Sequence, residues 1–555
     1  MKPGEGVGIP VARYLRPEEQ VVPFWSRPEL DELVSWCTSG GHAGIRLVTG
    51  NGGAGKTRLA LRLAEELPAK EWQQLWVKRG SEREAVADAR EMRRPCLLVV
   101  DYAETRSELA GLLDDVAADE DGPKLRVILL ARSAGEWWQQ QRANAEELTA
   151  ALLEASAPVR LGPVQAAGGP QEVFDHAVTA FAQNLGVVRP DARLALSDPD
   201  PVVLVVHAAA LLAVADYAAG VRPRQQAASG SEVLAALLRH EARYWARTAG
   251  SRGLDLDVSV LRLAVAAGCL IGADSETAAG GLLARIPDLE LAERRGRVAR
   301  WLHDLYPAAD EVDARQREWL GSVRPDRLAE ELIAGELVKH QELIAPLFTG
   351  LDEVRAARAL TVLARAALTQ DRAVGLLGTA LAADVDQLAV PALSVAVETN
   401  SVVGELLGQV IGSMPVARQT LMRVVEESPY PSFALAAPSA VALQRLAEDS
   451  ADDTERAGWL VGLSNRLADL GRREEALAAI EEAAGIYRQL AQARPGAFLP
   501  NLVRALNNLA NALSYLNRDE ETSAIRDEAN AAVGGSTQLP QERVNDEANV
   551  QPSNP

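Results

Sequence analysis

The sequence predicts a multidomain protein in which an α/β domain, built on a parallel sheet, precedes a long all-α region. Short apolar runs alternate with helical patterns as far as about residue 165, a rhythm typical of a parallel sheet with helices on both faces. Beyond that point helical patterns follow one another without strand-like runs. Near the C-terminus a helix-turn-helix pattern recurs, which indicates helical repeats.

The composition is that of a globular protein and argues against some classes of partner. Of 555 residues, 48% are hydrophobic and 24% are charged, and the length is enough for several domains. The formal net charge of −20 argues against a general binder of nucleic acids or anionic membranes, because both would be repelled. We therefore expect no membrane association and no nucleic acid as a partner.

Cysteine usage and the N-terminus both predict a cytoplasmic protein. Cys37, Cys96 and Cys269 lie far apart without a nearby histidine, so each is predicted to be a small buried residue rather than a zinc ligand. The first five residues contain no apolar segment of the kind that begins a secretory signal. The longest apolar run, residues 202–215, is too short to span a bilayer and is predicted to be a buried helix.

Changes of pattern divide the chain into parts. The first residues are rich in glycine, proline and charge, and the last are polar with few large apolar side chains, so both ends are expected to lack fixed structure. The parts are a flexible arm over 1–20, the α/β domain over 21–165, a helical lid over 166–250, a winged-helix-like domain over 251–335, a helical-repeat spacer over 336–450, repeats similar to tetratricopeptide repeats over 451–532, and a disordered tail over 533–555.

The chain is organised around the motif Gly-Asn-Gly-Gly-Ala-Gly-Lys-Thr at residues 50–57. The motif follows an apolar run and opens a helical pattern, as a phosphate-binding loop does. Its glycines allow successive backbone N–H groups to converge on phosphate oxygens at a helix N-terminus. Lys56 would reach the β- and γ-phosphates, and the Thr57 hydroxyl would bind Mg²⁺. The predicted nucleotide-binding residues of this loop are Gly50, Gly52, Gly53, Ala54, Gly55, Lys56 and Thr57.

Two acidic residues follow the most continuous apolar strand, residues 96–100. Asp101 ends this strand, where a second acidic residue holds the magnesium ion of phosphate-loop enzymes; the alternative is an N-cap of the next helix. Glu104 is a candidate general base that orients the attacking water. Its alternative role is to favour the N-terminus of the next helix, because Tyr102 occupies the position that more often carries the acid.

A second strand end supplies a candidate phosphate sensor. Arg132 follows the apolar run of residues 127–130, at the edge of the sheet where the phosphate loop is expected. A guanidinium group there would contact the γ-phosphate and report its presence, and a surface arginine is the alternative. With Lys56, Asp101 and Glu104, it completes the predicted catalytic residues.

The clearest repeat lies between residues 454 and 532. The sequence Leu-Ser-Asn-Arg-Leu at 463–467 returns as Leu-Ala-Asn-Ala-Leu at 509–513, an offset of 46 residues (509 − 463). Small residues such as Ala476 occupy helix-packing positions, as in tetratricopeptide repeats, although the usual period is about 34. Thr522, at the position equivalent to Ala476, indicates that the second unit is degenerate or capping. We expect a protein or peptide ligand at these repeats.

Together these features resemble the STAND class of signalling P-loop ATPases, the group that contains NB-ARC and NLR-like switches. The resemblance rests on the phosphate loop, the Val-Val-Asp-Tyr and Leu-Leu-Ala-Arg strand ends, a helical lid, a small winged bundle and C-terminal repeats. It covers most of residues 21–532, and the phosphate loop is its most specific part.

The resemblance implies further site residues. The segment Phe-Trp-Ser-Arg, which ends at Arg27, looks like the entry segment that lines the adenine pocket. Pro201 looks like the lid proline that packs beside the nucleotide, and Arg132 looks like the sensor arginine. The Leu-His-Asp sequence around His303 looks like the winged-helix motif whose histidine holds the diphosphate in the resting state; a capping or surface pair is the alternative.

The function implied by the resemblance is an ATP/ADP-dependent signalling switch with slow, Mg²⁺-dependent hydrolysis. Such a protein rests with ADP, senses a ligand through its repeats, and opens or self-associates as a homo-oligomer when ATP replaces ADP. Only about twenty residues precede the nucleotide domain, so output is expected from oligomer surfaces or a separate partner rather than from an effector module. Two alternatives are an AAA-type remodelling ATPase with continuous turnover and an ATP-dependent transcriptional regulator.

Overall fold

The computed structural model of the chain describes residues 10–118, 122–155, 157–163, 166, 168–221, 226–308 and 318–536. The chain forms two compact units, Met1–Val410 and Ile411–Pro555. The division between them falls inside helix α18 (Val403–Ser413) and inside the spacer expected over 336–450, so this spacer does not behave as one part.

The α/β domain contains a five-stranded sheet with the strand order β2-β3-β4-β1-β5, in which each pair of neighbours is parallel. Each strand lies on an apolar run from which a strand was predicted, and the predicted fold class is confirmed. The strands are β1 (Ala43–Thr49), β2 (Gln73–Trp76), β3 (Cys96–Asp101), β4 (Leu125–Ala131) and β5 (Val159–Arg160).

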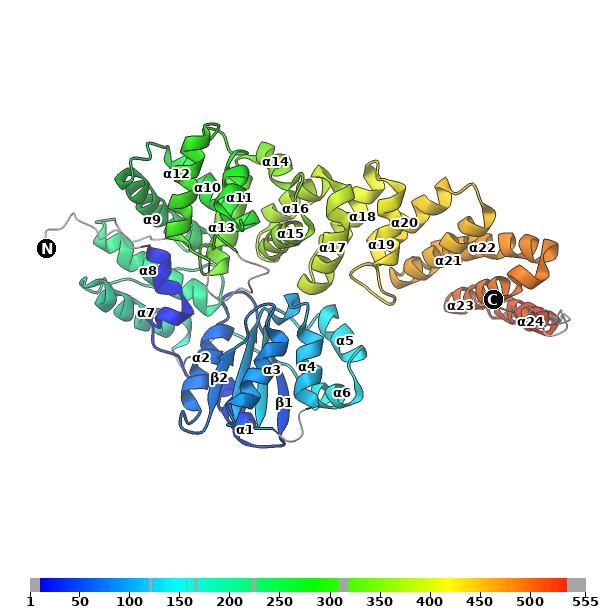
Figure 1. Cartoon of the computed structure of the whole chain (residues 1–555), viewed down its shortest axis with the longest axis horizontal. Helices are drawn as coiled ribbons and strands as arrows, with labels where there is room; N and C mark the ends of the chain where they lie inside the picture. The colour runs from blue at the N-terminus through cyan, green and yellow to red at the C-terminus, as the bar shows by residue number, and fades with distance from the viewer. Residues whose placement is uncertain are drawn as a thin grey trace, which may run out of the picture. The chain divides into compact units, whose positions relative to one another are not determined.

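Helices cover both faces of this sheet (Figure 1), because alternate residues of the central strands face opposite layers. Leu98 and Val100 of β3 lie in the core formed with α3 (Glu82–Glu91), α4 (Leu109–Ala117), α5 (Glu136–Ala143) and α6 (Glu147–Glu154). Leu97 and Val99 lie in the core formed with α1 (Pro28–Thr38) and α2 (Lys56–Glu66). The carboxyl ends of the strands therefore meet at one edge, where the phosphate loop joins β1 to α2.

The lid consists of three helices, α7 (Gly169–Leu185), α8 (Val203–Ala218) and α9 (Gly230–Ser251). Helix α9 begins with a capping box, in which the Ser229 and Glu232 side chains each accept a hydrogen bond from the other's backbone N–H. Helix α8 packs against both of the other lid helices. The apolar run of residues 202–215 is thus a buried helix, as predicted, and none of the described helices is long and apolar enough to cross a membrane.

Residues 10–20 are ordered against the lid, which corrects the flexible arm expected over 1–20. Two 3₁₀ turns cover Val11–Leu15 and Pro17–Glu19, and the first packs on α8 and α9. Ala12 and Leu15 are buried, and the Ala12 backbone N–H donates a hydrogen bond to Glu241 of α9. A few apolar side chains are enough to fix this segment, although its prolines and charges suggested a loose one. The remainder of the arm, residues 1–9, lies outside the described residues.

Three helices and an antiparallel bridge follow the lid, in the part of the chain predicted to be winged-helix-like. The helices are α10 (Val258–Ile271), α11 (Glu276–Leu283) and α12 (Ala292–Leu305), and Pro307 then bridges Leu320. Residues 309–317, between the two bridging residues, lie outside the described part of the chain. The boundary predicted at residue 335 falls inside helix α13 (Asp326–Leu337), which packs on α9 and α10.

The first unit continues with four further helices of the spacer, α14 (Ile344–Phe348), α15 (Glu353–Ala367), α16 (Asp371–Ala383) and α17 (Val385–Thr399). Helix α15 packs on α10, α13 and α17. Helix α17 packs on α5 and on the 3₁₀ turn η3 (Ala103–Thr105), which follows strand β3. Spacer helices therefore lie beside the carboxyl edge of the sheet (Figure 1).

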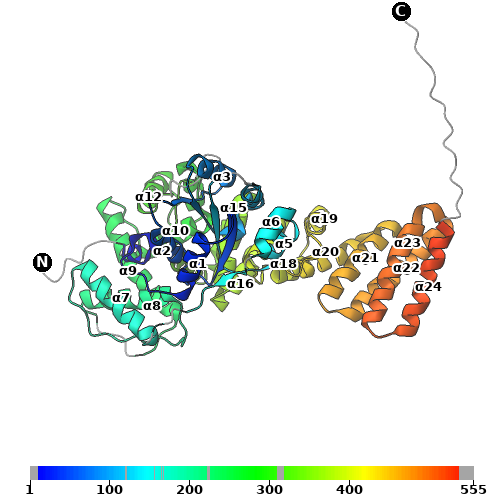
Figure 2. The same ribbon diagram turned by 90° about the horizontal axis from the view of Figure 1, so that it is seen from below.

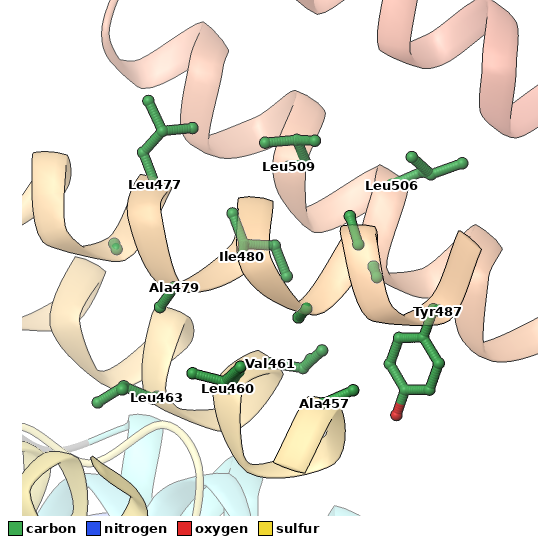
Figure 3. Packing of buried hydrophobic residues seen from close by; sticks show 14 of the residues in the cluster. Ala457, Leu460, Val461, Leu463, Leu477, Ala479, Ile480, Tyr487, Leu506 and Leu509 are labelled. Atoms are coloured by element: carbon green, nitrogen blue, oxygen red, sulfur yellow. The ribbon is translucent and has the colours of Figure 1, made fainter. Parts of the chain in front are cut away.

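The second unit consists of antiparallel helices, and Figure 2 shows α21 to α24 lying side by side. Their shared core contains alanine, leucine and isoleucine, with Tyr487 as its largest buried side chain (Figure 3). Ile480 of α22 lies between residues of α21 and α23, so each helix is covered by its neighbours. The helices are α19 (Arg418–Glu426), α20 (Ala436–Asp449), α21 (Asp453–Asp469), α22 (Arg473–Ala493), α23 (Pro495–Tyr515) and α24 (Asp519–Ser536).

The offset of 46 residues is visible in backbone conformation as well as in sequence. Gly471 and Asn517, 46 residues apart (517 − 471), end α21 and α23 with φ angles of 72° and 57°. Glycine and asparagine tolerate this left-handed conformation best. Ala476 and Thr522, which are equivalent in the two repeats, are both buried. Helical repeats are therefore present in this part of the chain, as two helix pairs between Asp453 and Ser536.

Helix α24 runs to Ser536, so the first residues of the tail predicted to be disordered over 533–555 are helical. Residues 537–555, the rest of that tail, lie outside the described residues.

Candidate functional site

The phosphate loop has the backbone that its glycines predict. Gly53 and Gly55 have φ angles of 86° and 95°, a conformation that residues with a Cβ rarely adopt. Gly55 is the N-cap of α2, so the first free N–H groups of this helix point into the loop. The Lys56 ammonium group donates to the carbonyl oxygens of Gly50, at 2.6 Å, and Asn51, at 3.4 Å.

Side chains from other parts of the first unit lie against the loop where glycines leave room for them. A Cβ at Gly52 would stand 3.3 Å from Cγ of Arg327 and 3.4 Å from the guanidinium of Arg132. A Cβ at Gly53 would stand 2.7 Å from Cβ of Leu204. The loop is thus a cradle lined by backbone N–H groups and flanked by cations, which fits the phosphate groups of a nucleotide.

Thr57 and Asp101, the two residues expected to hold Mg²⁺, lie together at the end of β3. The Thr57 hydroxyl donates a hydrogen bond of 3.2 Å to the Asp101 carboxylate. Burial raises the pKa of Asp101, against the opposing effects of Lys56, the Tyr102 backbone N–H and the Thr57 hydroxyl. Hard oxygen ligands of this kind suit Mg²⁺, which keeps water and phosphate oxygens as its other ligands. Among the described residues no cluster of three or more histidine, cysteine or acidic side chains offers a different metal site.

Lys56 lies in an environment that disfavours its charge. Burial, with a further contribution from Arg132, lowers the pKa of its ammonium group to about 8, although Glu104 and Asp101 act in the opposite direction. An anionic phosphate group would relieve this repulsion among cations. The cluster of positive charge at the loop therefore favours a bound anion.

Glu104 lies in η3, close to the phosphate loop, and is buried with 7% of its surface exposed. One carboxylate oxygen accepts the backbone N–H of Arg132 at 3.4 Å and lies 3.5 Å from the guanidinium of Arg365. The other oxygen is buried without a hydrogen-bond partner in the described part of the chain. Such a carboxylate has the free acceptor capacity that a general base needs.

Arg132 follows β4 and is engaged by a residue from α13. Its guanidinium forms an ion pair of 2.5 Å with Glu330, whose side chain is only 3% exposed. Burial lowers the pKa of Arg132, but the carboxylates of Glu330 and Asp326 outweigh burial and raise this pKa above its ordinary value. The candidate sensor is thus permanently charged and bound to another element of the first unit.

Arg27, proposed from the family resemblance, lies against the loop, and Pro201, proposed in the same way, precedes the helix that contacts it. Arg27 is buried and donates to the carbonyl oxygens of Ala54, at 3.0 Å, and Gly162, at 2.8 Å, so it braces the loop from the entry segment. Pro201 is buried just before α8. The N-terminus of α8 then contacts the loop, and the Leu204 backbone N–H donates to the Gly53 carbonyl at 3.1 Å.

The structure does not bring His303 together with the phosphate loop. Its ring is stacked on Trp319, with ring centroids 4.4 Å apart, and Nδ1 is 2.8 Å from the Trp319 carbonyl oxygen. Among the described residues of this region of the sequence, the side chain that lies next to Gly52 is instead that of Arg327, at the start of α13. The expected histidine thus packs inside the winged bundle, and an arginine about one helix later in the chain occupies the place next to the loop.

Sequence reasoning missed four charged residues that the structure places around the loop. Tyr102, which follows Asp101, donates to Asp326 at 2.6 Å, and the Arg365 guanidinium lies 4.9 Å from the centre of the Tyr102 ring. These residues stand on amphipathic helices, where charges normally mark a solvent-exposed face. The only available signal was the dense charge at the start of α13, which is equally typical of a surface helix. The missed residues are Asp326, Arg327, Glu330 and Arg365.

Comparisons with known proteins agree with the α/β domain and add little beyond it. Residues 24–145 match the sequence model of the family described as Novel STAND NTPase 5. None of the curated proteins compared matches the chain significantly. A solved structure from Pyrococcus horikoshii, described as a Signal Transduction ATPase with Numerous Domains (STAND) protein with a tetratricopeptide repeat sensor, matches 92% of this chain and 84% of that chain. Its identity is 12% and its TM-score is 0.24, so the superposition supports no argument about fold or site.

Proposed function

We propose that this chain, whose residues 24–145 match a STAND NTPase family, has an NTPase domain there and is an ATP/ADP-dependent switch. Nucleotide binding follows from the class and from the phosphate loop, while the choice of ATP and ADP, the Mg²⁺ ion and the switching are our proposals.

The observation that supports switching best is the ion pair between Arg132 and Glu330. Arg132 ends a strand of the NTPase domain, whereas Glu330 belongs to α13, outside that domain. A guanidinium in contact with the loop is suited to bind a terminal phosphate, and it cannot make its full set of bonds to both a phosphate and Glu330. Binding of ATP would therefore weaken the contact with α13, whereas ADP, without a γ-phosphate, would leave it intact.

The residues of the NTPase domain would have different roles around a bound nucleotide. Lys56 and the backbone N–H groups of the loop would hold phosphate oxygens, and Thr57 and Asp101 would hold Mg²⁺. When bound, the ion would neutralise charge on the phosphate oxygens. Glu104 would orient a water molecule through its free carboxylate oxygen. Arg27 would keep the loop in place from behind.

Arg327 is our candidate for the residue that senses the diphosphate from outside the NTPase domain, in place of His303. Its stem lies against Gly52, and burial lowers the pKa of its guanidinium, with Arg132 contributing in the same direction. A phosphate group would compensate the repulsion between these two cations. In the ADP state Arg327 would thus hold α13 against the loop.

These contacts give the two nucleotides different affinities for two conformations, which is what a switch requires. The conformation with α13 on the loop favours ADP, and the one in which Arg132 is free favours ATP. We further propose that a protein or peptide bound at the repeats of α21 to α24 shifts this equilibrium, and that the ATP form associates with other copies of the chain. Turnover would be slow, because the ATP form must persist long enough to signal.

The experiment that tests the switch compares Glu330→Gln with Glu331→Gln. Both glutamates are 3% exposed and belong to α13, but Glu331 pairs with Arg372 of α16. Glu330→Gln removes the carboxylate that competes with the γ-phosphate for Arg132 and keeps the size of the side chain and a carbonyl acceptor. We expect the affinity for ATP relative to ADP to rise about tenfold, which is about 1.4 kcal/mol of coupling free energy. Glu331→Gln is expected to leave this ratio unchanged.

Affinities are measured by isothermal titration calorimetry with Mg²⁺-ATP and Mg²⁺-ADP. Equal changes in both variants, or an unchanged ratio in Glu330→Gln, would remove Arg132 and Glu330 from the switch. The nucleotide released by denaturing the purified protein separates this proposal from continuous turnover. Bound ADP with negligible hydrolysis supports the switch, whereas many ATP molecules hydrolysed per minute without a trigger would instead favour a remodelling ATPase.

A further inference from the structure

Arg365 belongs to helix α15 of the spacer, yet its guanidinium lies among residues of the NTPase domain. Its side chain is 10% exposed, with one nitrogen 3.5 Å from Glu104 and another 3.9 Å from Asp326. Its Cζ atom lies 4.9 Å from the centre of the Tyr102 ring, a cation–π distance. A residue more than 250 positions away in the sequence therefore contacts the end of β3, where the candidate general base stands.

The burial of a charged arginine at this place calls for an explanation. Its Nε atom has no hydrogen-bond partner among the described residues, so the desolvation of the charge is only partly compensated. An apolar side chain of similar length would fill the same space without this cost. The position is therefore better explained by what the charge does to its neighbours than by packing.

Helix α17 holds the same region from a second direction. It packs on η3, which carries Glu104, and Val397 packs against the core of the NTPase domain. Glu398 of α17 is also near both arginines of the region, Arg79 and Arg365; burial raises its pKa to about 7. Two helices of the spacer thus bound the space around Glu104.

We propose that Arg365 is a positioning residue that holds Glu104 in a resting orientation and restrains hydrolysis until α15 moves. The ion pair with the guanidinium occupies the Glu104 oxygen that also accepts the Arg132 backbone N–H. The orientation of a carboxylate held in this way is set by its two protein partners rather than by a water molecule. Movement of α15 removes the guanidinium and leaves this oxygen with the Arg132 N–H alone, so the carboxylate can turn towards a water molecule.

The chemistry restrained in this way is the hydrolysis of ATP, so the proposal rests on the proposed function. The water oxygen bonds to the terminal phosphorus, and the bond from this phosphorus to the bridging oxygen breaks. Glu104 takes the proton of the water, and the products are ADP and inorganic phosphate. Arg365 takes no part in these bonds and acts only through Glu104.

The test compares Arg365→Met with Arg372→Met in the full chain. Methionine keeps most of the length of arginine and loses the charge. Arg372 is a suitable control because it also ties a spacer helix to α13, but through Glu331 rather than through a contact with Glu104. We measure Mg²⁺-ATP hydrolysis in a single turnover and the dissociation constants of ATP and ADP.

Arg365→Met is expected to hydrolyse bound ATP about five to ten times faster, with both dissociation constants within about twofold of the original chain. Arg365→Lys, which keeps a charge without the planar fork, is expected to give an intermediate rate. Arg372→Met is expected to match the original chain. In the background of Glu104→Gln, Arg365→Met is expected to have no effect, because the residue through which it acts is neutral.

A slower rate in Arg365→Met with unchanged affinities would overturn the proposal, because Arg365 would then act on the phosphates. Equal effects of both methionine variants, or an effect that survives Glu104→Gln, would also overturn it. If Arg365→Met does not fold, the rate of Arg365→Lys decides, since a rate equal to or below that of the original chain contradicts the proposal. Failure of the original chain to bind ATP refutes the proposed function and this inference together. Binding without any effect of Arg365 refutes only the inference.

Discussion

Three cations meet at the phosphate loop, and their mutual repulsion is the clearest physical sign of its ligand. Lys56, Arg132 and Arg327 come from three different elements, and each is close to Gly52 or to the loop that contains it. Burying like charges together costs free energy unless an anion or a carboxylate compensates them. Glu330 compensates one of them in this conformation, and a nucleotide would compensate all three.

The lowered pKa of Lys56 makes nucleotide affinity depend on pH. Because the folded protein holds this pKa at about 8, below the ordinary 10.5, the ammonium form is present below pH 8 and is lost above it. We expect the dissociation constant of ADP to rise up to about tenfold between pH 7 and pH 9, with proton uptake on binding. Calorimetry in two buffers of different ionisation enthalpy measures both effects. An affinity that stays constant up to pH 9.5 would contradict the placement of Lys56.

Arg327 and His303 make opposite predictions for retention of ADP. Arg327→Ala removes a guanidinium whose stem lies beside Gly52 and is expected to weaken ADP binding about tenfold, by the loss of one charge-assisted contact. His303→Ala removes a ring stacked on Trp319 and is expected to lower the stability of the winged bundle without changing ADP affinity. Dissociation of a fluorescent ADP analogue, measured by stopped flow, and thermal unfolding distinguish the two. Weaker ADP binding in His303→Ala alone would restore the histidine to the site.

At the scale of elements, a feature could be predicted from the sequence only where residues close together in the chain define it. The strands, the phosphate loop and the pairing of Thr57 with Asp101 follow from periodicity and one motif, because neighbours along the chain define them. The contacts of α13 and α15 depend on charges at helix positions, such as Glu330 and Arg365, that would be equally suitable for solvent. Only the tertiary fold shows which face each helix buries, so these residues could not be found from one sequence.

Because α8 packs so closely on the loop, a single methyl group added at Gly53 is expected to affect both nucleotide binding and stability strongly. Gly53→Ala would place a Cβ 2.7 Å from Leu204 and would also strain a backbone with a φ angle of 86°. We expect lost nucleotide binding and a free energy of unfolding lower by about 1 to 3 kcal/mol. Gly41→Ala is the control, because a Cβ there meets no atom within 4 Å and its φ angle is not positive. Titration with ADP and denaturant unfolding measure both quantities, and equal behaviour of the two variants would contradict the contact.

At the scale of the whole molecule, the chain has two units with separate hydrophobic cores. The first contains every residue assigned to the candidate site, and the second contains the repeats packed around Ile480 and Tyr487. Periodicity at 46 residues revealed the second core, whereas the division at residue 410 was not visible in sequence. It lies within a continuous helix, α18, and no change of composition marks it.

Two cores predict two thermal transitions with different ligand responses. ADP should raise the midpoint of one transition, because it binds the folded form of the first unit, and should leave the other unchanged. Ile480→Ala, in the centre of the repeat core, is expected to lower only the second transition, by about 2 to 5 kcal/mol in free energy of unfolding. Differential scanning calorimetry records both. A single transition that ADP and Ile480→Ala shift together would show that the units unfold as one.

The hydrogen bond from Leu204 to Gly53 also has a consequence for the lifetime of a bound nucleotide. The lid shares a backbone contact with the loop that would hold the phosphates, and any movement of α8 away from the loop would have to break it. Such a movement would also expose the apolar start of the helix to water, so it would have an activation barrier. If release requires this movement, the lifetime of the bound state would depend on an apolar helix end as well as on the charges around the phosphates, and changes at Val203 or Leu204 would alter that lifetime without removing an ionic contact.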